Sequence, residues 1–184
     1  MVSRDNRSSP TGGEYACRTV SRLKTCPLRR CLPCVGHFTD INYHLVFATR
    51  ERRPVLAPER RDVLLRYFWG IAKKRSCHVY RMNAVDDHAH ILFSLHPTVC
   101  LADFVRDLKA ASTDMIRRQC VFPGFAGWQD GYGAFTIAAA ERPTVIRYIA
   151  DQQRHHAAGG ETSMDELRRM LAAAGVAVDE RFFR

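Results

Sequence analysis

Several features that would assign the chain to a class are missing from its 184 residues. No apolar run reaches the ~18 residues that a membrane-spanning helix needs, so we expect no transmembrane segment. The early arginines are not followed by an apolar stretch, so the pattern is not that of a secretory signal peptide. No internal repeat is visible, and the cysteine spacing suggests no disulfide framework. These absences lead us to expect a cytoplasmic protein.

The composition that remains is that of a globular protein with a basic bias. Hydrophobic residues make up 46% of the chain and charged residues 26%, which allows a sizeable buried core. The formal net charge of +9 favours a polyanionic partner, above all nucleic acid. Residues 1–36 hold seven basic and two acidic side chains, a net charge of +5, and leave +4 for the rest. The body is therefore only mildly basic, and its charge alone does not identify a partner.

Residues 1–36 are rich in Ser, Gly, Pro and Arg and show neither helical nor strand periodicity. This segment holds four of the seven cysteines, Cys17, Cys26, Cys31 and Cys34. A zinc site would need the second CxxC pair of a zinc ribbon, which is absent, so we expect a disordered basic leader instead. The other three cysteines lie among apolar residues and are interpreted as reduced core cysteines: Cys77, Cys100 and Cys120.

From residue 37 onward the hydrophobic pattern predicts alternating strands and helices. Strands are expected at Ile41–Thr49, His78–Val85, His88–Leu95 and Ala134–Ile137. Helices are expected at Pro58–Lys74, Leu101–Gln119, Glu141–His156 and Met164–Ala174. The order β-α-β-β-α-β-α predicts an α+β protein of the ferredoxin-like or RRM-like kind. In such a fold, helices cover one face of an antiparallel sheet, and the other face is open for function.

The strand His88–Leu95 carries a pair of histidines on its polar face. Strand side chains alternate between faces, so the apolar residues share one face while His88 and His90 share the other, roughly 7 Å apart. Both rings can converge on a metal ion that takes a third ligand from elsewhere. Asp86 and Asp87 can ligate that ion or orient a ring. On this motif alone, a chance pair of surface histidines is the alternative.

The helix Glu141–His156 places polar side chains beside an apolar stripe. At about 100° per residue, Tyr148, Gln152 and His155 fall within roughly 60° of arc. A tyrosine with a pKa near ~10 is a competent nucleophile only when it is deprotonated or poised, which a nearby divalent cation would favour. The alternative is a tyrosine at the edge of the core with a hydrogen-bonded hydroxyl.

Together these motifs resemble one family. The segments that carry the resemblance are Tyr43–Pro54, Asp87–Leu92, Trp128–Phe135 and Tyr148–His156. From about Asp40 to Arg184 the chain is similar to the single-strand-DNA tyrosine transposases of the IS200-like insertion sequences. These belong to the HUH endonuclease class, with REP-associated tyrosine transposases as relatives. The segment Val178–Phe183 also matches the family's end, whereas residues 1–36 have no counterpart, so we expect residues 37–184 to form the transposase domain.

The resemblance implies an HUH endonuclease fold and a mechanism. His88 and His90 would hold Mg2+ or Mn2+ with Gln152 as the third protein ligand. Tyr148 would attack a phosphate in single-stranded DNA, leaving a 5′-phosphotyrosine and a free 3′-OH for later rejoining. The implied partners are single-stranded DNA with hairpin ends and a second subunit, in a homodimer that combines one subunit's histidines with the other's tyrosine. We expect no membrane partner.

Further basic and aromatic residues are candidates for a DNA path. Phosphate contacts are expected from Arg50, Arg52, Arg53, Arg106 and Lys109. A solvated charged face is the alternative for each of them. Trp128 and Tyr132 can stack on unpaired bases, although for Trp128 we favour a position packed in the core.

Two other functions remain open at this point. A non-catalytic, domesticated or inactive nucleic-acid-binding relative on an RRM-like sheet would show aromatic residues on the sheet face, where this chain has histidines. Another HUH nuclease, such as a replication initiator or relaxase, usually places its tyrosine differently or carries two. The sequence favours the transposase.

Overall fold

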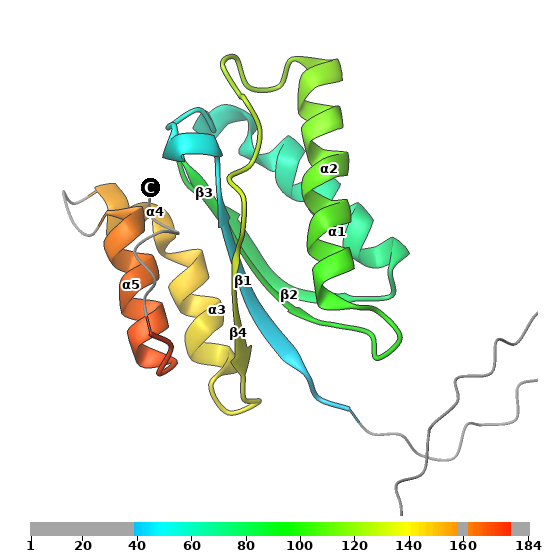
Figure 1. Cartoon of the computed structure of the whole chain (residues 1–184), viewed down its shortest axis with the longest axis vertical. Coiled ribbons are helices and arrows are strands. Elements are labelled where there is room, and N and C mark those ends of the chain that lie inside the picture. The colour runs from blue at the N-terminus through cyan, green and yellow to red at the C-terminus, as the bar shows by residue number, and fades with distance from the viewer. Residues whose placement is uncertain (1–38, 158–161, 178–184) are drawn as a thin grey trace, which may run out of the picture. The chain divides into compact units, whose positions relative to one another are not determined.

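A computed structural model describes residues 39–157 and 162–177 of the chain (Figure 1), with the backbone alone for residues 155–157. The expected leader, residues 1–36 with their four cysteines, lies outside the described residues. The segment Val178–Phe183 and the side chain of His155 lie outside them as well.

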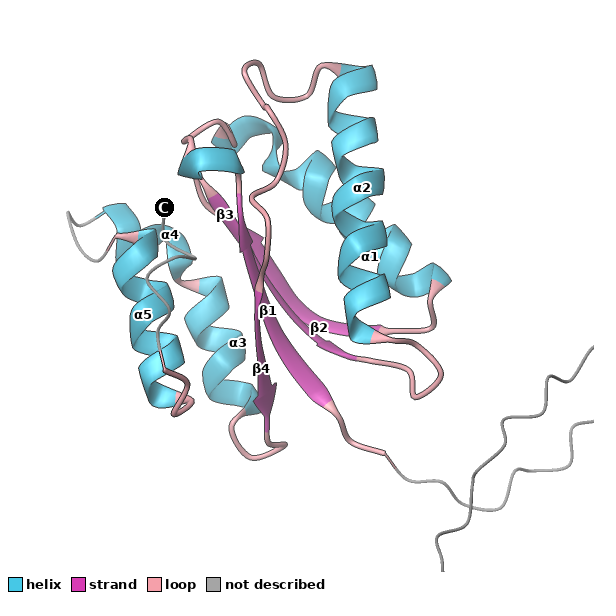
Figure 2. Cartoon of the chain, in the orientation of Figure 1, coloured by secondary structure: helices cyan, strands magenta, loops and turns pink. Residues whose placement is uncertain are grey.

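An antiparallel sheet of four strands forms the centre of the fold (Figure 2). The strands are β1 (Asn42–Ala48), β2 (His78–Ala84), β3 (His88–Ser94) and β4 (Gly133–Ile137). They lie in the order β2-β3-β1-β4, with every neighbouring pair antiparallel. This is the order of a ferredoxin-like sheet, and the predicted α+β class is confirmed. The four predicted strands agree with the observed ones to within one residue at each end.

Two helices, α1 (Arg61–Lys74) and α2 (Leu101–Gln119), cover one face of the sheet. Two short 3-10 turns precede α1: η1 (Arg50–Arg52) after β1, and η2 (Pro58–Arg60). The apolar faces of both helices meet the apolar face of β3. The fully buried side chains of this core include Leu64, Phe68, Phe104, Leu108, Ala89 and Phe93. The apolar helix faces predicted from the 3.6-residue spacing are therefore the faces that are buried in the core.

The second face of the sheet, which the sequence led us to expect open, is covered by the last three helices (Figure 1). These are α3 (Arg142–Ala150), α4 (Gln152–Ala157) and α5 (Ser163–Ala173). This face also carries apolar side chains, because Leu92 and Val46 alternate with its histidines and are buried. Ile149 of α3 is fully buried, and the Asn83 amide on β2 donates to its carbonyl at 2.8 Å. The apolar stripe of α3 therefore finds its partner on the sheet.

The predicted helix Glu141–His156 is divided in the structure. Asp151, with φ −90° and ψ 6°, ends α3 and separates it from α4. Aspartate is a poor helix former, which favours the break at this residue. Pro143 lies in the first turn of α3, where a missing N–H costs nothing. Among the residues that the structure describes, no helix is both long and apolar enough to cross a membrane.

The glycine-rich stretch between α2 and β4 is a loop, and Trp128 anchors it to the core. Trp128 is 8% exposed, its indole N–H donates to Ser112 Oγ at 2.9 Å, and its ring packs edge-on against Phe47. The position of Trp128 in the core is thus confirmed.

The cysteine prediction is correct for one residue and wrong for two. Among the described residues Cys77, Cys100 and Cys120 are all free, and Cys77 is buried. Cys100 and Cys120 are exposed, because they lie just beyond the two ends of α2. Val121 and Phe122, which follow Cys120, are buried in the core, but the exposed cysteines do not share that position.

Candidate active site

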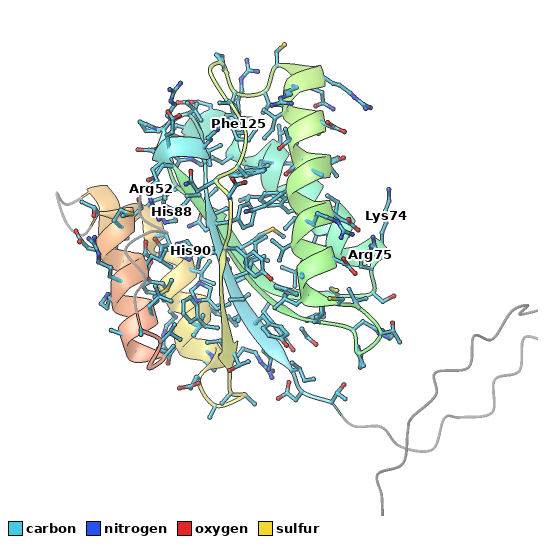
Figure 3. All side chains as sticks on the ribbon, viewed as in Figure 1. Arg52, Lys74, Arg75, His88, His90 and Phe125 are labelled. Carbon is cyan, nitrogen blue, oxygen red and sulfur yellow. The ribbon has the colours of Figure 1, made fainter. Side chains whose placement is uncertain are left out.

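The polar face of β3 holds His88 and His90 between the sheet and the helices on its second face (Figure 3). Both rings are buried, with 2% and 0% exposed, and their centroids lie 4.8 Å apart. The separation of polar and apolar faces predicted for this strand is confirmed, since Ala89 and Ile91 belong to the core. Buried imidazoles need polar partners, because an unsatisfied buried polar group is costly.

Glu166, in the first turns of α5, is one such partner for both histidines. Its side chain is buried, with Oε2 at 3.1 Å from His88 Nε2 and Oε1 at 3.4 Å from His90 Nε2. One ligand atom from each of the three residues lies within 4.8 Å of the other two. Two ligands on one ion at bond lengths of ~2.1 Å lie up to about 4.2 Å apart, so small adjustments suffice. Imidazole and carboxylate donors in this arrangement fit a divalent metal ion.

Gln152, the third ligand that the family resemblance implies, belongs to the same cluster. It is fully buried, and its Nε2 donates to Glu166 Oε1 at 2.7 Å. In this arrangement the amide supports Glu166, and the carboxylate of Glu166 contacts the histidines. The cluster therefore contains two residues from α4 and α5 that can complete a metal site.

A second layer of side chains holds the two histidines in place. His88 Nδ1 is 2.6 Å from Asp87 Oδ1, and Ser163 Oγ donates to Asp87 Oδ2 at 2.6 Å. His90 Nδ1 is 3.0 Å from His44 Nε2. A contact of this kind at one ring nitrogen fixes the orientation of a ligating imidazole. The Nε2 atoms of both rings are thereby left facing the cluster.

The cluster is strongly polarised in the absence of a cation. Burial lowers the pKa of His44 to about 3, so this ring is neutral. Burial alone would raise the pKa of Glu166, but hydrogen bonds with His88 and His90 outweigh it and hold the pKa well below its usual range. Burial likewise opposes charge on His88, yet its bonds with Asp87 and Glu166 raise its pKa. A cation at this site would compete with protons for the imidazole nitrogens that face Glu166.

Tyr148 of α3 meets the cluster through its hydroxyl. The phenol O–H donates to Glu166 Oε1, and Arg169 Nη2 donates to the phenol oxygen at 3.1 Å. The tyrosine ring centroid is 6.1 Å from that of His90 and 6.1 Å from that of His44. Burial and the carboxylate of Glu166 both raise the pKa of Tyr148, so the phenol is protonated in this state. The predicted tyrosine and the predicted histidines thus come together within one chain.

The basic residues predicted after the first strand differ in their surroundings. Arg52 is half-buried beside the cluster and donates from Nη1 to Ser163 Oγ at 3.0 Å. Arg50 is exposed, and Arg53 is exposed and pairs with Glu51 at 2.7 Å. Of these three, Arg52 is the residue whose side chain contacts the site.

The remaining predicted DNA contacts are spread over the molecule. Arg106 is exposed on α2, across the sheet from the cluster, and pairs with Asp103 at 2.6 Å. Lys109 donates to the backbone carbonyl of Gln129 at 2.8 Å and so holds the loop before β4. Tyr132 is 42% exposed on the same loop. Tyr132 lines the same pocket as His88 of the cluster, whereas Arg106 lies on α2 on the other face of the sheet.

Sequence reasoning missed two residues of the cluster, His44 and Glu166. His44 lies on β1 directly opposite Leu92, and strand alternation places it on the same face as His90. That signal was available in the sequence. Glu166 lies 76 residues beyond His90 in a helix with no recognisable motif, and an acidic residue in a first helical turn is common for electrostatic reasons alone. Of the two aspartates, Asp87 orients a ring as expected, whereas Asp86 pairs with Arg61 instead.

Comparisons with known proteins agree on one family. The family model described as "Transposase IS200 like" matches residues 37–152. The ISDra2 transposase TnpA of Deinococcus radiodurans is 31% identical over 125 residues, which is 64% of this chain and 87% of that protein. The crystal structure of a candidate transposase from Deinococcus radiodurans R1 has a TM-score of 0.51 at 28% identity and covers 66% of this chain and 98% of that one. A REP-associated tyrosine transposase bound to a REP hairpin also has a TM-score of 0.51, at 15% identity, and covers 66% of this chain and 74% of that one.

Proposed function

Because the chain belongs to the IS200-like transposase family, we propose that it cuts and rejoins single-stranded DNA at the ends of an insertion sequence. Membership of this family indicates transposase function, and the cluster around His88 and His90 suggests the reaction mechanism. The observation that carries the proposal is the placement of Tyr148, whose hydroxyl shares one carboxylate oxygen of Glu166 with His90.

In the proposed reaction, the Tyr148 oxygen attacks the phosphorus of the scissile phosphodiester. A bond from the tyrosine oxygen to phosphorus forms, the bond from phosphorus to the 3′ oxygen breaks, and the released 3′ oxygen takes up a proton. The product is a 5′-phosphotyrosine, which keeps the number of phosphoester bonds unchanged. Attack by a 3′-OH of another strand reverses the step and frees Tyr148. Glu166 Oε1, which accepts the phenol's hydrogen bond, is the acceptor nearest to its proton.

His88, His90 and Glu166 would hold a divalent cation, Mg2+ or Mn2+, with Gln152 as the other candidate ligand. When bound, such an ion would polarise a non-bridging phosphate oxygen and offset the negative charge beside the phenol. The chain's own contribution is to bury the donors, to fix both rings from behind through Asp87 and His44, and to hold Tyr148 against them. Neutralising Glu166 removes one of the two causes that raise the pKa of Tyr148.

The proposed partners follow from the family as well. A REP-associated relative is bound to a REP hairpin, and we propose hairpin-ended single-stranded DNA as the ligand of this chain too. We also propose a homodimer in which α3 to α5 are exchanged between subunits, so that Tyr148 meets the partner's histidines through the contacts seen here within one chain. The free thiols among the described residues agree with a cytoplasmic location.

The proposal is tested by incubating the protein with end-labelled single strands and Mn2+ and looking for a covalent adduct on a denaturing gel. Wild type should form the adduct and Tyr148→Phe should not, because that change removes one oxygen and keeps the ring. Tyr67→Phe, on α1 across the sheet, is the matched control and should behave as wild type. If wild type binds the strand without ever forming an adduct, the chain is a non-catalytic relative.

A further inference from the structure

A pocket of about 250 Å³ adjoins the cluster on the His88 side and is not used by the chemistry above. Its walls come from β1, from the loop that leads into β4, and from α5. Ligand pockets for drug-sized molecules run from about 300 to 1,000 Å³, so this space suits one small planar group rather than a duplex. His88 lines both the pocket and the cluster, and the two sites are therefore continuous.

One side of the pocket carries a positive charge that the fold holds in place. Arg52 lines the pocket, and desolvation lowers its pKa while Asp87 opposes that effect. Glu51 and Arg52 both have positive φ, 56° and 51°, which is strained for residues other than glycine. Hydrogen bonds hold this turn: Glu51 N–H donates to Gln129 Oε1 at 2.9 Å, and Arg52 donates to Ser163. A guanidinium placed in this way suits a phosphate oxygen.

The pocket is also lined by apolar side chains and by a partly exposed aromatic ring. Leu167 and Leu171 line it from α5, and Tyr132 lines it from the loop with 42% of its surface exposed. An exposed aromatic ring beside an apolar slot is the usual stacking platform for an unpaired base. A lone phosphate or a metal ion would make no use of these apolar side chains.

We propose that this pocket binds the nucleobase next to the scissile phosphate, with the base against Tyr132 and Leu171 and the adjoining phosphate at Arg52. The proposal rests on the proposed function, since it takes its occupant from the strand whose phosphate would lie at His88. The pocket would then fix the position of the strand relative to Tyr148 and make cleavage depend on the presence of a base at one position.

The test is a binding scan with single strands that each lack one base, run by fluorescence anisotropy without added metal. In wild type, one abasic position should weaken binding by about tenfold, in line with the loss of one stacked base. Leu171→Trp fills the pocket, and Tyr132→Ala removes the ring from an exposed site where folding does not depend on it. In both variants the same abasic position should cost less than about twofold, because the base is already unbound there.

Ala173→Trp is the matched control, because it adds the same ring to an exposed position of the same helix. It should show the abasic pattern of wild type. If wild type, Leu171→Trp and Tyr132→Ala lose the same affinity at each abasic position, the proposal that this pocket binds a base is wrong. It is also wrong if wild type does not bind single strands. A wild type that binds and shows the pattern but forms no Tyr148 adduct would overturn only the cleavage chemistry, which keeps the two failures apart.

Discussion

Replacing Glu166 by alanine would reveal what this carboxylate does at the centre of the cluster. Without metal, the change removes the acceptor that His88, His90, Tyr148 and Gln152 all contact. Removing one partner of a buried ionic pair costs about 3–5 kcal/mol, a large part of the ~5–15 kcal/mol by which a domain is usually stable. Glu166→Ala should therefore lower the unfolding midpoint of the metal-free protein markedly, as measured by thermal unfolding.

The response to metal is the sharper measurement, because it separates a ligand from a structural neighbour. Mn2+ at about 100 times its dissociation constant should stabilise wild type by ~2.7 kcal/mol. For a chain of this size that stabilisation corresponds to roughly 5–10 °C in the unfolding midpoint. Glu166→Ala should lose most of this shift, since an anionic ligand is lost. Gln152→Ala should lose less of it, because a water molecule can replace a neutral ligand.

One control variant and two possible outcomes decide whether Glu166 or Gln152 is the metal ligand. Glu59→Ala, at an exposed glutamate of η2, should keep the full Mn2+ shift. A full shift in Glu166→Ala would show that Glu166 is not a ligand. If Gln152→Ala alone abolished the shift, the ligand set implied by the family would hold and Glu166 would be a residue that the cation displaces. Direct titration calorimetry with Mn2+ provides the same comparison without unfolding the protein.

The other predictions concern metal removal, the second layer, the leader and the subunits. EDTA, or His88→Ala with the fold intact by circular dichroism, should abolish cleavage, and full activity in EDTA would contradict the metal assignment. His44→Phe removes the partner of His90 Nδ1 and should weaken Mn2+ binding by about 10–100-fold, whereas an unchanged affinity would mean that the ring of His90 is held by packing alone. Deleting residues 1–36 should leave folding and cleavage near wild type and weaken non-specific DNA binding at low salt; loss of folding would show that the leader is structural. Mixing Tyr148→Phe with His88→Ala should restore cleavage if α3 to α5 are exchanged, and a mixture that stays inactive after heterodimers form would place both halves of each site in one subunit.

Much of the fold could be predicted because periodicity carries it. The alternation along His88–Ser94 separates a core face from a histidine face, and the 3.6-residue spacing from Leu101 to Gln119 matches α2 at both ends. The same local signals place Pro143 in a first helical turn and Trp128 in the core. In each case, residues close in the sequence determine the local structure or the burial of the side chain, so both can be predicted from the sequence.

What could not be predicted depends on contacts between distant segments. The burial of Glu166 follows from the docking of α5 on the sheet, and no local pattern marks that helix as part of a site. The packing of α3 to α5 on the second face of the sheet was not predicted either, because it also depends on contacts between distant segments. The fold class alone leaves that face open. Cys100 and Cys120 were misjudged because their neighbours are apolar, whereas their own positions at the ends of α2 are exposed.

The distribution of the cluster over the fold bears on the proposed dimer. The sheet contributes His44, His88 and His90, while Tyr148 and Glu166 both belong to the segment after β4. Because the phenol and the carboxylate contact each other, an exchange of this segment would carry both groups together to the other subunit. The turn Ala138–Glu141 joins it to the sheet, and two hydrogen bonds close this turn: Glu141 N–H donates to the Ala138 carbonyl at 3.0 Å, and Ala138 N–H donates to Glu141 Oε2 at 3.2 Å. Opening this turn would let α3 to α5 dock on another subunit with the same buried contacts, so an exchanged dimer costs little beyond the turn itself.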